Sequence, residues 1–196
     1  MQGLRLLFVC TANISRSPYA ERRTRQVLGE DRLHVESAGV PGFPDREMDP
    51  AMAALLVERG GDASGHLSRS VSEEILEGVD LIVPFEFDHH MRLLEDFPAH
   101  RHKIVGFGQL ATAARAWEAG TRTIESASDL VGAAVATAGI NAPLLDVADP
   151  YQRGGRVARA SADQIDEGLN ALLPVLAGGP VTPLEAPRKR LRWPWS

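Results

Sequence analysis

The segment at residues 10–18 (CTANISRSP) holds residue types that suit phosphoryl transfer. A tight loop can turn successive backbone N–H groups towards one anion, and a helix that follows adds the positive end of its dipole. Arg16 can add a planar, two-pronged contact to two phosphoryl oxygens. Cys10 faces the same anion hole, which favours its ionised, nucleophilic form. The segment therefore predicts a phosphate-binding loop with Cys10 as the nucleophile and Arg16 as the phosphate-binding arginine.

The remaining loop residues are expected to shape the same hole. Ser17 can donate a hydrogen bond to the thiolate, and Asn13 tolerates the left-handed backbone conformation that helps a loop curl its N–H groups inward. The residues expected to contact the substrate from this loop are Thr11, Ala12, Asn13, Ile14, Ser15 and Ser17.

A thiolate that attacks phosphorus also needs an acid to protonate the leaving oxygen, and the loop supplies none. Asp149-Pro150-Tyr151 follows an apolar pair far downstream, and its proline makes a rigid turn that could hold the carboxyl group over the site. Tyr151 could line the entrance and stack on an aromatic substrate ring. We expect Asp149 to be the general acid and Tyr151 to contact the substrate.

Taken together, C-x5-R-S-P after a first strand and Asp-Pro-Tyr near the C-terminal helix resemble the low-molecular-weight protein tyrosine phosphatase family. Residues 36–39 (ESAG) and 65–69 (GHLSR) resemble family segments whose Ser and His hydrogen-bond the loop asparagine, which implies that Ser37 and His66 support Asn13. The resemblance implies a four-stranded parallel sheet, the roles given above for Cys10, Arg16 and Asp149, and a phosphotyrosine-containing protein substrate. It implies no metal or organic cofactor.

Several departures from the family pattern keep other functions open. Arsenate reduction by the same loop is the first alternative, but it normally needs additional cysteines, and Ser15 stands where the family often has a second cysteine. Phosphoarginine hydrolysis is the second alternative. Relatives with that activity carry threonine at the Ile14 position, whereas a branched apolar residue there favours a flat tyrosyl ring. Phe43 is expected to take the place of the family's usual bulky aromatic residue, and the rim after the third strand is altered to Pro84-Phe85-Glu86. A non-catalytic phosphotyrosine-binding module is the third alternative.

The histidines are not expected to form a metal site. His89 and His90 are adjacent and point in different directions on a helix, without a carboxylate at ligand spacing. A solvated helix face is the preferred interpretation of this pair, with His100 and His102 nearby.

Alternating strands and helices must position these residues. Strands are expected at residues 4–9, 32–36, 79–83 and 102–107, and helices at 17–28, 50–60, 87–94 and 158–176, with a short one capped by Ser70. This α/β order predicts a doubly wound parallel sheet flanked by helices, with ligands bound beyond the carboxyl ends of the strands. Residues 108–140 read as a helical insertion.

Composition is that of a single globular domain. The chain has 196 residues, of which 44% are hydrophobic, and we assign residues 1–180 to one domain. A net charge of -5 argues against a general nucleic-acid binder. The single cysteine, the lack of a long apolar run and the lack of a cleavage pattern predict a cytoplasmic protein.

The last residues, 181–196, differ from the rest because they are basic and contain tryptophans (RKRLRWPW). A disordered end is the preferred interpretation, with contact to a membrane or an acidic partner as the alternative.

Overall fold

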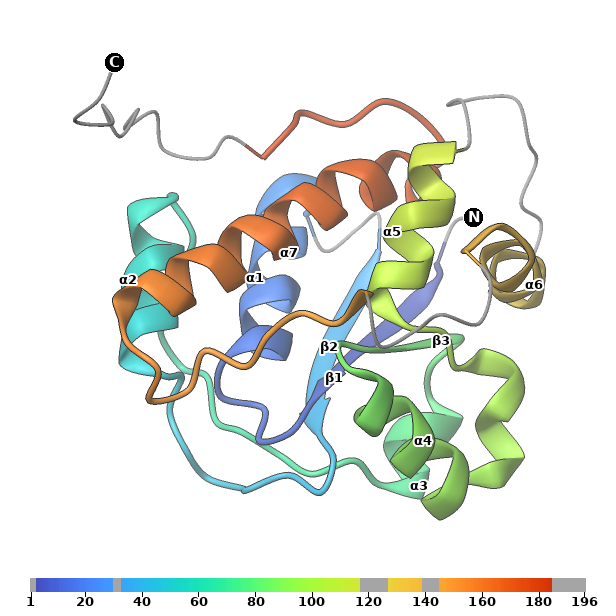
Figure 1. Ribbon diagram of the computed structural model, residues 1–196, viewed down its shortest axis with the longest axis horizontal. Coiled ribbons are helices and arrows are strands. Elements are labelled where there is room, and N and C mark those ends of the chain that lie inside the picture. Colours follow the sequence, from blue (N-terminus) through green and yellow to red (C-terminus); the bar gives the residue numbers. More distant parts are fainter. Residues whose placement is uncertain (1–2, 30–32, 117–126, 139–144, 185–196) are drawn as a thin grey trace.

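The computed structural model describes residues 3–29, 33–116, 127–138 and 145–184. Its centre is a parallel sheet in the order β2-β1-β3, formed by β1 (Arg5–Cys10), β2 (His34–Gly39) and β3 (Leu81–Pro84). Both outer strands pair with β1, so Cys10 lies opposite Gly39 in the register and Val9 lies opposite Pro84. The carboxyl ends of all three strands therefore meet at one edge, where the loop after Cys10 begins (Figure 1).

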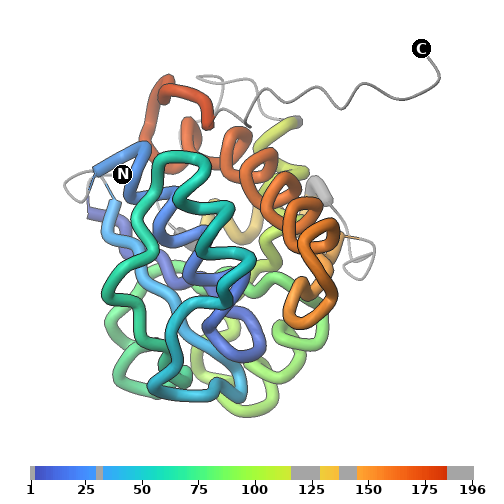
Figure 2. Tube along the Cα trace, turned by 90° about the vertical axis from the view of Figure 1, so that its left-hand side faces the viewer, coloured from blue at the N-terminus to red at the C-terminus, as the bar shows by residue number. Residues whose placement is uncertain are grey.

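Helices cover both faces of the sheet because side chains of a strand alternate between the faces. Leu6 and Phe8 belong to the larger apolar core, whereas Leu7 and Val9 belong to the smaller one. The larger core packs under α1 (Arg16–Leu28), α2 (Pro50–Glu58), α5 (Phe107–Ala116), α6 (Ala127–Ala138) and α7 (Gly155–Leu176). The smaller core packs under α3 (Glu73–Glu77) and α4 (Phe87–Asp96). Figures 1 and 2 show α7 lying beside α1 and α2.

Two helix starts differ from the sequence prediction. Helix α1 begins at Arg16 with Ser15 in the N-cap position, because the Ser17 hydroxyl is turned back to Cys10 and the Ala38 carbonyl. Helix α3 is capped by Ser72, whose side chain accepts from the Ile75 N–H, and not by Ser70. Pro50 in α2 behaves as expected, since the Asp49 side chain before it accepts from two backbone N–H groups.

The fourth predicted strand is reduced to a single parallel bridge between Ile104 and Ile82 in the part of the sheet that the structure describes. The reason is local: a 3-10 helix, η1 (Pro98–Lys103), ends just before Ile104, and α5 starts at Phe107. Only a short extended piece remains, and the Val105 N–H still donates to the Ile82 carbonyl. The α/β class with a parallel sheet is confirmed, with three strands where four were expected.

The region 108–140, expected to be helical, contains α6 and most of α5 in the described residues. That residues 108–140 are an insertion, and that residues 1–180 form one domain, stays a prediction. The prediction of a disordered basic tail concerns mostly residues 185–196, which lie outside the described residues. Among the helices of the described ranges, none is both long and apolar enough to cross a membrane.

Candidate active site

The loop between β1 and α1 turns its carbonyl groups away from the space that it encloses. Four of them accept hydrogen bonds from groups outside the loop, at distances of 2.7 to 2.9 Å. Because the C=O and N–H of a trans peptide point in opposite directions, the N–H groups that follow these carbonyls face inward. The accepting pairs are Cys10 with Val40 N, Thr11 with Gly42 N, Asn13 with His66 Nε2, and Ile14 with Asp49 N. This arrangement lines the enclosed space with backbone donors, which suits the binding of an anion.

Asn13 holds the turn of the loop in place. Its backbone is left-handed, with φ of 58°, and its side chain is fully buried. Its Nδ2 donates to Ser37 Oγ at 2.8 Å and to Ser17 Oγ at 3.0 Å, while its Oδ1 accepts from the Arg69 N–H at 2.9 Å. Ser37 and His66 therefore both hydrogen-bond Asn13, and burial lowers the pKa of His66. This buried hydrogen-bond network holds the loop in its conformation.

The Cys10 sulfur lies 3.0 Å from Ser17 Oγ. The same hydroxyl also lies 3.3 Å from the Ala38 carbonyl oxygen and accepts from Asn13. A serine hydroxyl has one proton, so it can donate to only one of these two partners at a time. An ionised sulfur can only accept, so in the thiolate state the proton of Ser17 turns to Cys10.

The Arg16 guanidinium is buried, with 1% of the residue exposed, and is anchored through one nitrogen. Its Nη1 donates to Glu86 Oε1 and to the Val147 carbonyl, both at 2.7 Å. Its Nη2 lies 3.5 Å from Asp149 Oδ1 and 3.4 Å from Thr11 Oγ1. Its Nε is buried and has no hydrogen-bond partner among the described residues. The Nε and Nη2 edge is thus available for an oxyanion in the loop.

Asp149 lines the same pocket as the loop and lies on the segment that precedes α7. Its side chain is 42% exposed, and its Oδ1 accepts from the Tyr151 N–H at 3.3 Å as well as lying near Arg16. Tyr151 is 38% exposed at the entrance. The carboxyl group can therefore reach both solvent and a group bound over the loop.

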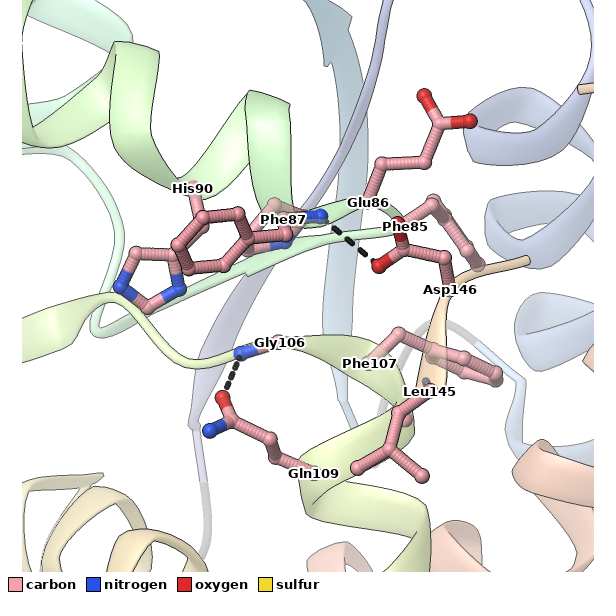
Figure 3. A pocket seen from close by; sticks show the side chains of 11 residues that line it. Phe85, Glu86, Phe87, His90, Gly106, Phe107, Gln109, Leu145 and Asp146 are labelled. Atoms are coloured by element: carbon pink, nitrogen blue, oxygen red, sulfur yellow. Dashed lines mark hydrogen bonds between the residues drawn. The ribbon is translucent and has the colours of Figure 1, made fainter. Parts of the chain in front are cut away.

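The segment that carries Asp149 is docked on the end of β3. The Val147 N–H donates to the Phe85 carbonyl at 3.0 Å, and Asp146 Oδ1 accepts from the Phe87 N–H at 2.9 Å. Figure 3 shows the second of these contacts beside a small pocket, with the Glu86 side chain pointing away from that pocket. Burial raises the pKa of Asp146. These contacts fix the start of the segment only two residues before Asp149.

One pocket unites most of the residues predicted from the sequence. Its lining comprises Cys10, Thr11, Ala12, Ile14, Ser15, Arg16, Phe43, Arg46, Asp149 and Tyr151. The side chains of Asn13 and Ser17 are instead fully buried, where they support the loop, although the sequence placed them at the substrate.

Two residues of the site were missed from the sequence. Glu86 contacts Arg16, and His89 Nε2 lies 2.8 Å from Thr11 Oγ1 and 3.1 Å from Glu86 Oε2. The expected solvated face is wrong for His89, which is 4% exposed and whose pKa is lowered to about 4 by burial and by Arg16. His100, which lies nearby in the sequence, is also buried, and its Nε2 lies 2.6 Å from Glu73 Oε1. The i, i+3 spacing of Glu86 and His89, directly after a strand next to β1, was the signal available in the sequence.

No group of three or more potential metal ligands occurs among the described residues. The polar groups that line the pocket are amides, two guanidinium groups, hydroxyls, a thiol and a carboxyl group, a set that suits an oxyanion better than a cation.

The family model for "Low molecular weight phosphotyrosine protein phosphatase" matches residues 5–121 of the chain. The chain belongs to this family. The match includes the loop, Ser37, His66 and Glu86, whereas Asp149 lies beyond it.

Individual relatives agree with this membership. The low molecular weight protein-tyrosine-phosphatase Wzb of Escherichia coli (strain K12) is 37% identical over 103 residues, which is 53% of this chain and 69% of Wzb. A protein-arginine-phosphatase of Bacillus subtilis (strain 168) is 30% identical over 109 residues, covering 55% of this chain and 72% of that protein. Among solved structures, a low molecular weight protein tyrosine phosphatase from T. tengcongensis superimposes with a TM-score of 0.66 at 27% identity. That match covers 88% of this chain and 99% of the other.

Proposed function

We propose that this phosphatase-family chain hydrolyses phosphotyrosine in proteins through a phosphorylated Cys10. The Cys10 thiolate attacks phosphorus, the bond from phosphorus to the tyrosyl oxygen breaks, and Asp149 gives its proton to that oxygen. Water then attacks phosphorus while Asp149 takes a proton from it, and the bond from sulfur to phosphorus breaks. Inorganic phosphate leaves and the thiolate is restored.

The observation that carries this proposal is the lining of one pocket by Cys10, Arg16 and Asp149. The inward N–H groups and the free edge of Arg16 can stabilise the phosphoryl oxygens, where positioning and electrostatics supply most of the catalysis. Asp149 is near enough to Arg16 to stand beside a phosphoryl group held there. A reducing compartment suits a catalytic thiol, and we propose the cytoplasm as the location.

The pocket walls favour a flat aromatic ring. Ala12, Ile14, Phe43 and Tyr151 give the pocket apolar surface above the loop, and the two aromatic residues are partly exposed at its mouth. Phosphotyrosine presents a ring to such walls, whereas phosphoarginine presents a polar guanidino group that needs hydrogen-bond partners. Hydrolysis of phosphoarginine peptides in preference to phosphotyrosine peptides would contradict this assignment of substrate.

The proposal is tested with para-nitrophenyl phosphate and a phosphotyrosine peptide at mildly acidic pH. Cys10→Ser should abolish turnover, because the hydroxyl is a far weaker nucleophile. Asp149→Ala should lower kcat with the peptide by about 10² or more, the usual contribution of a general acid, and less with the better nitrophenol leaving group. Turnover retained in Cys10→Ser would overturn the mechanism, and equal losses with both leaving groups would remove Asp149 as the acid.

A further inference from the structure

The mouth of the pocket carries one cation that the proposed mechanism does not use. Arg46 is exposed and its guanidinium lies over the Phe43 ring, 5.6 Å from the ring centroid. Both residues line the pocket, on the wall formed by the segment after β2. A cation on an aromatic face is partly stabilised there and keeps its hydrogen-bond donors free.

The segment that bears both residues is held rigidly from below by Ser68, which is 3% exposed. Ser68 Oγ donates to the Phe43 carbonyl at 2.6 Å and accepts from the Arg46 N–H at 2.9 Å. The Ser68 N–H also donates to the Arg46 carbonyl at 2.8 Å, and the Asp45 N–H donates to the Ser68 carbonyl at 2.9 Å. A buried hydroxyl thus ties both ends of the turn, so the position of Arg46 at the mouth is set before any substrate arrives.

The charge of Arg46 is not neutralised by an acidic side chain in the described part of the chain. None of the ion pairs found there includes it, and its neighbours Asp45 and Glu47 do not line the pocket. The sole acidic residue in the pocket lining is Asp149, which the proposed mechanism uses. Arg46 is therefore available for a carboxylate that a substrate brings to the rim.

We propose that Arg46 makes this site select phosphotyrosine flanked by aspartate or glutamate, an inference that rests on the proposed function. The phosphotyrosine ring enters between Phe43 and Tyr151, and the peptide backbone on either side of it passes over the rim. An acidic side chain next to the phosphotyrosine then meets the Arg46 guanidinium, which can bind a carboxylate through two parallel N–H groups. A lysine or arginine at the same place meets a like charge.

The test measures binding of fluorescent phosphotyrosine peptides to the Cys10→Ser variant, which keeps the pocket without the nucleophile. The three peptides differ only at the positions that flank the phosphotyrosine, two on each side. One peptide carries glutamate at these positions, one glutamine and one lysine. We expect the glutamate peptide to bind about threefold more tightly than the glutamine peptide at low salt, the scale of one exposed ion pair. That preference should shrink at high salt because the pair is exposed.

Arg46→Gln in the same background should abolish the preference, and Arg46→Lys should retain part of it. Arg101→Gln is the matched control, because it removes the same charge from an exposed residue that does not line the pocket. The inference is contradicted if the preference for the glutamate peptide survives Arg46→Gln, or if Arg101→Gln also abolishes it. Absence of any preference in the parent would do the same.

These experiments distinguish failure of the proposed function from failure of the inference about Arg46. If para-nitrophenyl phosphate is not turned over but the glutamate peptide is still preferred, the phosphatase activity is contradicted and the selectivity stands. If there is turnover but no preference, only the role of Arg46 is contradicted.

Discussion

The Arg16 guanidinium shows how a single residue can serve the fold and the ligand with different atoms. Its Nη1 is bound by Glu86 and by the Val147 carbonyl, so these two contacts set the rotation of the whole planar group. Its Nε is left without a partner among the described residues, although it is buried. Burying a donor without a partner costs free energy, and an oxyanion that accepts a hydrogen bond from this donor removes that cost when it binds. This gives a physical reason to expect that phosphate-like anions bind here.

His89 makes the stability of the protein depend on pH. Its pKa is lowered to about 4 in the fold by burial and by Arg16, against the opposing charges of Asp149 and Asp88, from the ordinary value of 6.5. Between pH 6.5 and about 4 the unfolded chain therefore binds a proton that the folded chain does not. The free energy of unfolding should fall across this window as pH falls, by up to about 3 kcal/mol from this residue.

The measurement is urea unfolding of the wild type and of His89→Gln at pH 7 and pH 4.5. Glutamine keeps an N–H donor near Thr11 and does not titrate, so the variant should lose less stability on acidification. His66 and His90, whose pKa values burial also lowers, leave it with part of the dependence. An identical pH dependence in both proteins would show that His89 is not responsible.

The sequence could predict the loop chemistry at this scale because Cys10, Arg16, Asn13 and Ser17 lie within one short segment. It could not predict which Arg16 nitrogen is free, because Glu86 and Val147 come from distant parts of the chain. Adjacent histidines gave no indication of burial, since that depends on how α4 packs against the smaller core.

Helix α4 is capped from outside by the segment that carries Asp149, the proposed general acid. Its own N-cap residue, Glu86, makes no side-chain capping bond, and Asp146 accepts from the Phe87 N–H instead. We expect Asp146→Ala to lower the free energy of unfolding by about 1 kcal/mol, as for loss of an N-cap. It should also release the start of the acid segment and lower kcat more with a phosphotyrosine peptide than with para-nitrophenyl phosphate.

Asp146→Asn is the matched variant, because the amide oxygen can still accept from Phe87. It should restore most of both the stability and the kcat ratio between the two substrates. If Asp146→Ala lowers the stability but changes kcat by the same factor for both substrates, the contact does not position Asp149.

Elements that start or stop on local chemistry were predictable, and elements that depend on tertiary demands were not. The Asp49-Pro50 start of α2 is local, and it agrees with the prediction. The start of α1 does not, because the Ser17 hydroxyl serves the sulfur and not the helix end. The shortened fourth strand is a separate case, because η1 and α5 occupy the residues on either side of it and leave only a short extended piece between them.

Across the whole molecule, a buried charge cluster joins α1, the end of α2 and α7. Asp166, 3% exposed, accepts from Arg23 at 2.9 and 3.0 Å, from Arg59 at 2.7 Å and from the Tyr19 hydroxyl at 3.2 Å. Burial raises the pKa of Tyr19, and the charge of Asp166 adds to the rise. Removing the carboxylate would leave two buried guanidinium groups without their shared anion.

We expect Asp166→Ala to lower the free energy of unfolding by about 3–5 kcal/mol, measured by urea unfolding, because it leaves buried charges unpaired. Asp163→Ala is the matched control: Asp163 also pairs with Arg59, but its side chain is 52% exposed. Its loss should cost less than about 1 kcal/mol. Equal costs for the two variants would mean that the cluster does not hold the three helices together. The sequence predicted the apolar spacing of α7 but not this cluster, whose members are 107 to 147 residues apart from Asp166.

The double anchoring of Arg16 ties enzymatic competence to the integrity of the entire fold. Glu86 follows the central sheet and Val147 precedes the last helix, so neither can hold the guanidinium unless chain regions 61 residues apart in sequence have assembled correctly around it. Partly assembled states would therefore be inactive, and recovery of turnover during refolding should report completion of the native structure and not the earlier collapse of its core.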